Sequence, residues 1–192
     1  MGTETVSEAF RGIDTWPGSR ILEAMLDGKL AAVEAVRAAL PALDAAAEQS
    51  VIRLKRGGRL VYAGAGTSGR IALQDGVELT PTFGWPAERL VYLMAGGTRA
   101  VTESVEGAED DSEAGESEVD GADIGPDDVV LALAASGTTP YTIGVVHRAR
   151  ERGALTIGIA NNAGAPLLEK WREEMGPEAD LILSQYYVSV GR

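Results

Sequence analysis

The sequence contains no cysteine, one histidine and two phenylalanines. Without cysteine, disulfides, thiolate catalysis and cysteine-based metal sites are excluded. The absence agrees with a reducing compartment, so we expect a cytoplasmic protein. A single histidine, His147, also argues against a zinc site, and we expect neither a metal nor a cofactor. His147 falls in the middle of an expected peripheral helix, where a structural or exposed role is the simplest interpretation.

Positive charge is scarce as well. Lys and Arg number 17 against 29 Asp and Glu, and the net charge is −12. Proteins that bind nucleic acid normally present a basic face, so we expect no nucleic acid and no anionic membrane as partner. Runs long enough to span a bilayer are missing, and MGTETVSEAF lacks the pattern of a signal peptide. A small anion can still bind, because backbone N–H groups at a helix start hold phosphate without net positive charge.

The 192 residues are enough for one well-buried domain. Residues 1–18 are polar and are expected to form an extended arm. Apolar residues recur at helical spacing over residues 20–54, which predicts two helices with a break near residues 27–28. Pro41 is expected to begin a new helix rather than to interrupt one.

Short apolar runs follow, alternating with helical patterns. They cover residues 59–63, 90–94, 129–134 and 155–160, and residues 180–183 are interpreted as a fifth. Alternation of strands and helices predicts a three-layer α/β fold with a five-stranded parallel sheet flanked by helices. The runs are continuously apolar, which indicates burial on both faces of the sheet.

The first candidate binding segment is GAGTSGR, residues 64–70, which we call the first loop. It lies between a strand and a helix, where glycines allow close approach and the helix start offers free N–H groups. Gly66, Thr67 and Ser68 are therefore candidate binding residues. The segment also matches the dinucleotide fingerprint, but the next strand ends in MAGG without the expected acidic residue. A Walker A loop is excluded because Arg70 and Ile71 follow Gly69. A tight turn with a capping hydroxyl is the structural alternative.

The second candidate segment consists of Ser136, Gly137, Thr138 and Thr139, which we call the second loop. It also follows an apolar run and precedes a helix that begins near Pro140. One capping hydroxyl would suffice for that helix, so the additional hydroxyls favour a ligand over simple capping. Both loops follow parallel strands at their carboxyl ends, which predicts that they face one crevice.

Acidic residues are concentrated over residues 103–120, where nine of eighteen positions are Asp or Glu. Such a run is typical of a solvated loop and helix start. Glu106, Glu109 and Asp110 are so close in sequence that spacing alone cannot select among them. Glu78 is expected near the end of the helix after the first loop, where a Glu is usually just exposed.

Four segments together indicate a family: TETVSEAFRGIDTWPGSRILEAM, GGRLVYAGAGTSGRIALQDGVELTPTFG, AGGTRAVTESVEGAEDD and DVVLALAASGTTPYTIGVVHRARERGALTIGIANN. Over residues 3–168 the sequence resembles the N-acetylmuramic acid 6-phosphate etherase family of the sugar isomerase (SIS) domain superfamily. The resemblance implies an SIS phosphosugar-binding domain over residues 56–192, preceded by an arm and helices over residues 1–55. The C-terminal helical part of the family is expected to be absent. SIS domains dimerise with sites near the interface, so a homodimer is implied.

The resemblance also implies a lyase, which cleaves the D-lactyl ether of a sugar 6-phosphate and yields N-acetylglucosamine 6-phosphate and D-lactate. Such chemistry needs one acid and one base. By motif match, the acid is Glu78 in DGVELTPTFG and the base is Glu109 in VEGAEDD. Two other functions stay open: a non-catalytic phosphosugar-binding regulatory protein, and an aldose–ketose sugar-phosphate isomerase.

Overall fold

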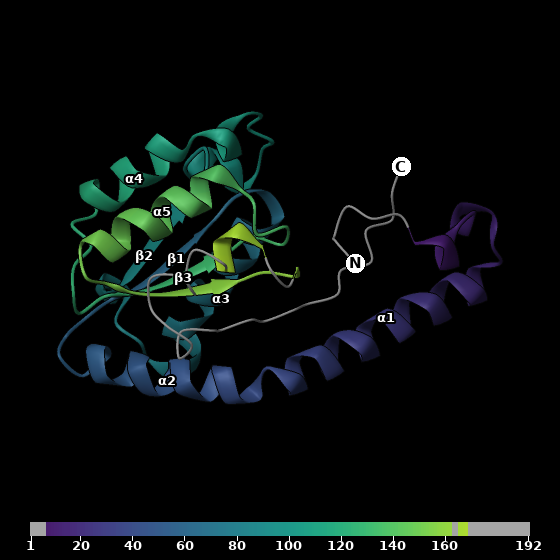
Figure 1. The fold of residues 1–192 in the computed structure, drawn as a ribbon, viewed down its shortest axis with the longest axis horizontal. Helices are drawn as coiled ribbons and strands as arrows, with labels where there is room; N and C mark the ends of the chain where they lie inside the picture. The colour runs from purple at the N-terminus through teal and green to yellow at the C-terminus, as the bar shows by residue number, and fades with distance from the viewer. Residues whose placement is uncertain (1–6, 163–164, 169–192) are drawn as a thin grey trace.

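The computed structural model describes residues 7–162 and 165–168 (Figure 1). Within them, four parallel strands form one sheet in the order β2-β1-β3-β4. The strands are β1 (Leu60–Gly64), β2 (Leu90–Met94), β3 (Val129–Leu133) and β4 (Leu155–Ile159). Each coincides with an apolar run of the sequence, so four of the five predicted strands are confirmed. The fifth, expected at residues 180–183, lies outside the described residues.

Helices cover both faces of the sheet, as predicted. One face carries α4 (Ser112–Gly121) and α5 (Pro140–Glu151), and the other carries α2 (Leu40–Leu54) and α3 (Gly66–Phe83) (Figure 1). The alternation of side chains in β1 explains this arrangement. Val61 and Ala63 are fully buried in the core shared with α4 and α5. Tyr62 points to the other face, where Gly76 of α3 lets the helix approach its ring.

The N-terminal region departs from the prediction in two ways. Short 3₁₀ turns at Glu8–Phe10 and Ile13–Thr15 precede the helices, so the described part of this arm is not simply extended. The helix break lies at Ala39, between α1 (Gly18–Ala38) and α2, and not near residues 27–28. Gly28 only weakens a helix interior, whereas a proline is accommodated at a helix start. The prediction that Pro41 begins a helix is confirmed, because it occupies the first turn of α2.

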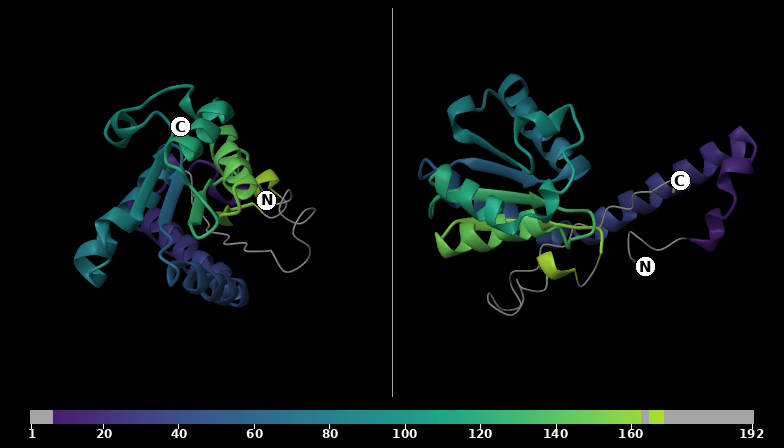
Figure 2. Two further views of the ribbon diagram at one scale, coloured as in Figure 1. Left: turned by 90° about the vertical axis from the view of Figure 1, so that its left-hand side faces the viewer. Right: turned by 90° about the horizontal axis from the view of Figure 1, so that it is seen from above.

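Helix α1 projects away from the sheet and its flanking helices (Figures 1 and 2). No residue of α1 is buried. Its large apolar residues recur at helical spacing and are exposed: Leu22, Met25, Leu26, Leu30 and Val33. None of the helices formed by the described residues is long and apolar enough to cross a membrane.

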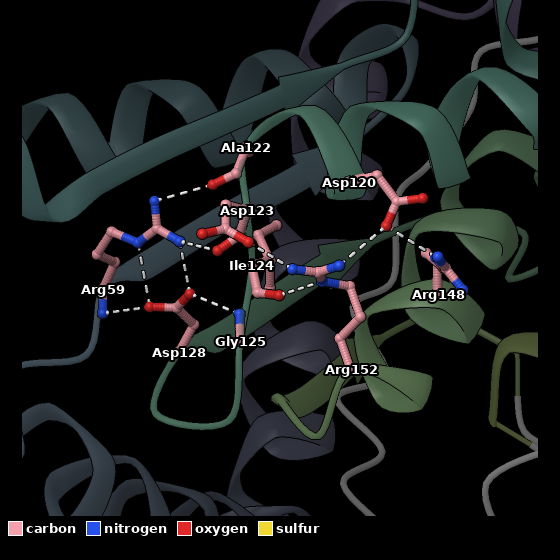
Figure 3. A network of polar contacts seen from close by, with 9 residues as sticks. All are labelled: Arg59, Asp120, Ala122, Asp123, Ile124, Gly125, Asp128, Arg148 and Arg152. Atoms are coloured by element: carbon pink, nitrogen blue, oxygen red, sulfur yellow. Dashed lines mark hydrogen bonds and ion pairs between the residues drawn. The ribbon is translucent and has the colours of Figure 1, made fainter.

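The amino-terminal ends of the strands are held by an ion-pair network (Figure 3). Asp128 accepts hydrogen bonds from Arg59 N at 2.8 Å, from Arg59 Nη2 at 2.7 Å and from Gly125 N at 3.0 Å. Burial raises the pKa of Asp128, but these hydrogen bonds and the guanidinium charge outweigh burial and leave its pKa below the usual value. Arg59 thereby joins the strand start to the turn before β3.

Two further arginines extend this network to the ends of α4 and α5. Arg152 contacts Asp123 and donates to Asp120 Oδ1 at 3.3 Å, and Arg148 donates to the same Asp120 oxygen at 2.9 Å (Figure 3). The helices that cover one face of the sheet are thus tied together at the end opposite the two candidate loops.

Candidate functional site

The first loop is mostly the first turn of a helix. Strand β1 ends at Gly64 and α3 begins at Gly66, so Thr67 and Ser68 are helical residues rather than loop residues. Gly66 has a φ of +53°, which favours glycine. Gly69 is buried, and a Cβ there would lie 2.3 Å from Met94 Sδ. These glycines bring the free N–H groups of α3 close to the carboxyl end of the sheet.

The second loop is organised by its own hydroxyls. Ser136 Oγ accepts hydrogen bonds from Thr138 N at 3.2 Å and from Thr138 Oγ1 at 3.0 Å. Gly137 has a φ of +70°, and a Cβ there would lie 2.3 Å from Ala165 Cβ. Thr139 is the N-cap residue of α5 but makes no side-chain capping hydrogen bond. Capping by Thr139 is therefore not the reason for this cluster of hydroxyls.

The first loop contacts the residue that precedes the second loop. Ala135 N donates a hydrogen bond to Ser68 Oγ at 3.3 Å, which joins the start of α3 to the end of β3. Strands β1 and β3 are neighbours in the sheet, so both loops follow the carboxyl ends of adjacent strands. Both loops therefore lie at the same edge of the sheet, while their facing one crevice stays a prediction.

A cavity of about 360 Å³ lies at this edge. It is lined by the start of α3 and by residues 95–109, which we call the cavity loop and which connect β2 to α4. The lining residues are Ala65, Gly66, Thr67, Arg70, Ala95, Ala100, Ser104, Val105, Glu106, Gly107, Ala108 and Glu109. The structure thus brings Gly66 and Thr67 of the first loop together with Glu109. Ser68 and the four residues of the second loop are not among the residues that line it.

In the acidic stretch of residues 103–120, the structure separates residues that line the cavity from residues that do not. Glu109 lies in a 3₁₀ turn, Ala108–Asp110, which follows Gly107 with a φ of +74°. Asp111 then caps α4, because its Oδ1 accepts a hydrogen bond from Ala114 N at 2.9 Å. Glu106 and Glu109 both line the cavity, whereas Asp110 does not. Sequence spacing could not select among Glu106, Glu109 and Asp110, and two of these three carboxylates line the cavity.

Glu78 is not brought into this cavity. It lies on the exposed surface of α3, which continues to Phe83, so Glu78 is within the helix rather than at its end. At 1.5 Å per residue, it lies about 18 Å further along the helix axis than Gly66. Two apolar residues of the same helix are also exposed: Val77 by 50% and Phe83 by 75%.

Arg70 is a cavity residue that sequence reasoning did not select as a site residue. Its Nε donates to Ala100 O at 3.0 Å and to Val101 O at 3.2 Å, and its Nη2 donates to Glu103 O at 2.9 Å. Arg70 is the one cationic residue among those that line the cavity. Its place as the last residue of the first loop was a signal for it, but the sequence did not show its partners thirty residues away.

His147 is exposed, as expected, with Nε2 3.9 Å from Glu151 Oε1. In residues 7–162 and 165–168, no group of three or more His, Cys, Asp and Glu side chains is placed to hold a metal ion.

The comparison with family models identifies the class of protein as an SIS domain. The family model for the glucokinase regulatory protein N-terminal SIS domain matches residues 43–150, more than half of the chain. The chain therefore belongs to this family of SIS domains. A phosphoheptose isomerase from Francisella tularensis has a similar fold, with a TM-score of 0.64 and 22% identity, over 91% of this chain and 89% of that one.

The curated relatives are more specific. The chain is 56% identical to the N-acetylmuramic acid 6-phosphate etherase of Deinococcus radiodurans, over 86% of this chain and 54% of that protein. It is 45% identical to the etherase of the same name from Shouchella clausii, over 93% of this chain and 62% of that protein. The predicted resemblance to the etherases is confirmed. The chain spans between about half and three fifths of the length of these two relatives.

Proposed function

We propose that this chain forms the phosphosugar-binding and catalytic part of a lyase that cleaves the D-lactyl ether of N-acetylmuramic acid 6-phosphate. The products are N-acetylglucosamine 6-phosphate and D-lactate. The observation that carries the proposal is the cavity in which Glu109 faces the start of α3, in a chain that is 56% identical to a curated etherase. Such an enzyme would act in the cytoplasm, in the recycling of cell-wall amino sugars.

The start of α3 is suited to the phosphoryl group. Its first N–H groups have no partner within the helix, and the helix dipole favours an anion at this end. Thr67, which lines the cavity, adds a hydroxyl donor. The second loop, tied to the first through Ser68 and Ala135, supplies Ser136, Thr138 and Thr139 as further donors around the same ligand.

Glu109 has the position required of the base. Opening of the sugar ring places C2 beside an aldehyde, which makes the C2 proton acidic. A carboxylate removes that proton, the lactate leaves from C3, and water adds to the alkene that results. The departing oxygen needs a proton donor, since an ether oxygen is a poor leaving group. Glu109 lines the cavity and is exposed to it, so it is available to a bound sugar.

We assign the proton donor to Glu78 of a second copy of the chain. Within one copy, α3 separates Glu78 from the start of the helix by about 18 Å. The exposed apolar residues of α3, and those along α1, favour burial against another copy, with residues 1–55 as the arm that packs on it. A homodimer would then contain two sites, each with carboxylates from both copies.

Release of D-lactate from N-acetylmuramic acid 6-phosphate by the full chain tests the function. Glu109→Gln and Glu78→Gln should each lower release at least about 100-fold. An equimolar mixture of the two variants, exchanged through the dissociated state, should recover about a quarter of wild-type activity, because half of the dimers are mixed and one of their two sites is intact. Activity that survives in both single variants would remove the assignment, and absence of recovery would place both groups in one copy.

A non-catalytic phosphosugar-binding regulatory protein is the second candidate. The observation in its favour is the family model itself, whose description names the SIS domain of a regulatory protein. This function predicts that N-acetylmuramic acid 6-phosphate binds, with measurable heat, but releases no lactate. Conversion of an aldose phosphate to a ketose phosphate in the same assay would instead indicate an isomerase.

A further inference from the structure

The cavity loop, residues 95–109, carries both cavity carboxylates but has little structure of its own. It contains 3₁₀ turns at Thr98–Val101 and Ala108–Asp110, and its described main-chain hydrogen bonds at residues 98–109 close local turns only. Glu109 itself is exposed. The position of its carboxylate therefore depends on how the loop is attached to the rest of the protein.

Two attachments are visible. The loop folds back on itself where Val105 packs against Gly96, whose missing side chain leaves the room: a Cβ at Gly96 would lie 2.9 Å from Val105 Cβ. The second attachment is Arg70, which donates hydrogen bonds to the carbonyl oxygens of Ala100, Val101 and Glu103. Arg70 belongs to the same first turns of α3 that carry Gly66 and Thr67. It thus connects the expected phosphoryl-binding helix start directly to the loop that bears Glu109.

We propose that Arg70 is the positioning residue that holds Glu109 at a fixed place relative to the start of α3. The role of Glu109 as the base rests on the proposed function. The attachment of the cavity loop to Arg70 does not depend on that function. The guanidinium is suited to this because it is planar and presents several N–H donors in a rigid fork. One group can therefore bind the carbonyl oxygens of Ala100, Val101 and Glu103 together. A lysine would keep the charge but present one ammonium, which cannot reproduce the fork.

Arg70→Lys and Arg70→Met test this, with Arg99→Met as the matched control. Arg99 lies on the same loop, is 67% exposed and pairs with the Glu103 carboxylate at 3.1 Å. Both Met variants remove one positive charge, but Arg99 does not line the cavity. The first measurement is amide hydrogen exchange in the full chain without ligand. We expect faster exchange at residues 100–109 in both Arg70 variants and wild-type exchange there in Arg99→Met.

The second measurement is steady-state lactate release. We expect kcat to fall about 100-fold in both Arg70 variants with KM nearly unchanged, because a displaced base loses reactivity more than affinity. Recovery of kcat in Arg70→Lys, or a rise confined to KM, would show that Arg70 acts by its charge on the ligand and would overturn the proposal. Unchanged exchange at residues 100–109 in Arg70→Met would overturn it as well. If wild-type chain releases no lactate, the proposed function fails, and the exchange measurement still decides whether Arg70 holds the loop.

Discussion

The two ends of the parallel sheet are built differently. At the amino-terminal end, charged groups are partnered: Asp128 is buried and accepts hydrogen bonds from Arg59 and Gly125. At the carboxyl-terminal end, Glu106 and Glu109 are exposed to a cavity, and a helix start offers N–H groups without partners. The Asp128 carboxylate is bonded within the fold, whereas the carboxylates of Glu106 and Glu109 are exposed to the cavity. The contrast indicates that stability and ligand binding are separated along the strand direction.

The largest expected effect is on activity at the carboxyl-terminal end. Glu109→Gln keeps the shape of the side chain but removes its basicity, so lactate release should fall at least about 100-fold. Because Glu109 is exposed, the free energy of unfolding should stay within about 0.5 kcal/mol of wild type. Urea denaturation and a lactate assay measure the two quantities. Asp110→Asn is the control, since Asp110 is equally exposed but does not line the cavity, and an equal loss of activity there would contradict the assignment of the base.

At the amino-terminal end of the sheet, a substitution should change the free energy of unfolding more than it changes activity. Asp128→Asn leaves the Arg59 guanidinium without its charged partner and should lower the free energy of unfolding by about 3 kcal/mol, as is typical when one member of a buried pair is removed. Asp127→Asn is the adjacent control: the pair Asp127–Arg56 is exposed, with a separation of 3.7 Å, and its loss should cost less than about 0.5 kcal/mol. Equal destabilisation by both variants would mean that the network is not the source of stability.

The lowered pKa of Asp128 predicts that the free energy of unfolding depends on pH in the acid range. The pKa of Asp128 is lowered in the folded state, from an ordinary value of 3.8. Its contribution to stability is therefore fully present above pH 3.8 and is lost as the pH falls through the lower, folded-state pKa. Denaturation measured from pH 6 downward should show a steeper loss of stability in wild type than in Asp128→Asn. Parallel curves would show that Asp128 does not titrate differently in the two states.

A smaller effect concerns the packing of the start of α3 against the ends of β1 and β2. Gly69→Ala places a Cβ 2.7 Å from Gly64 O and closer still to Met94 Sδ, so we expect destabilisation by about 2 kcal/mol. In contrast, Gly121→Ala, at the end of α4, meets nothing within 4 Å and should be neutral or slightly stabilising. Thermal unfolding of the two variants measures the difference, and equal melting temperatures would show that α3 can shift away from the sheet without cost.

The smallest effect concerns a carboxylate between the two ends. Burial raises the pKa of Glu118, and the hydrogen bond from Tyr141 Oη, at 2.5 Å, only partly offsets it. Stability linked to Glu118 is therefore present below its unfolded-state pKa and is lost as the pH rises through the folded-state pKa. The Glu118→Gln variant lacks this titrating group. Its free energy of unfolding should therefore decline less than that of wild type between pH 4 and 7. Glu113→Gln, at an exposed position of the same helix, should keep the wild-type dependence.

Much of the fold could be predicted because it depends on local patterns. The four described strands coincide with continuous apolar runs, and buried parallel strands require such runs on both faces. The helix break was placed wrongly because glycine and proline both signal a possible break in sequence. The structure shows that α1 tolerates Gly28 in its interior, while the chain breaks beside Pro41.

The sequence by itself determined the two glycine- and hydroxyl-bearing segments after β1 and β3, because a strand end, a glycine and a helix start are encoded by neighbouring residues. Only the tertiary structure decided which acidic residues lie in a cavity with the first of these segments. It placed Glu106 and Glu109 at the cavity, left Glu78 on the far part of α3, and joined Arg70 to carbonyls at residues 100–103. Those contacts connect segments thirty or more residues apart, and their geometry follows from how β2, the cavity loop and α3 pack together rather than from any local pattern.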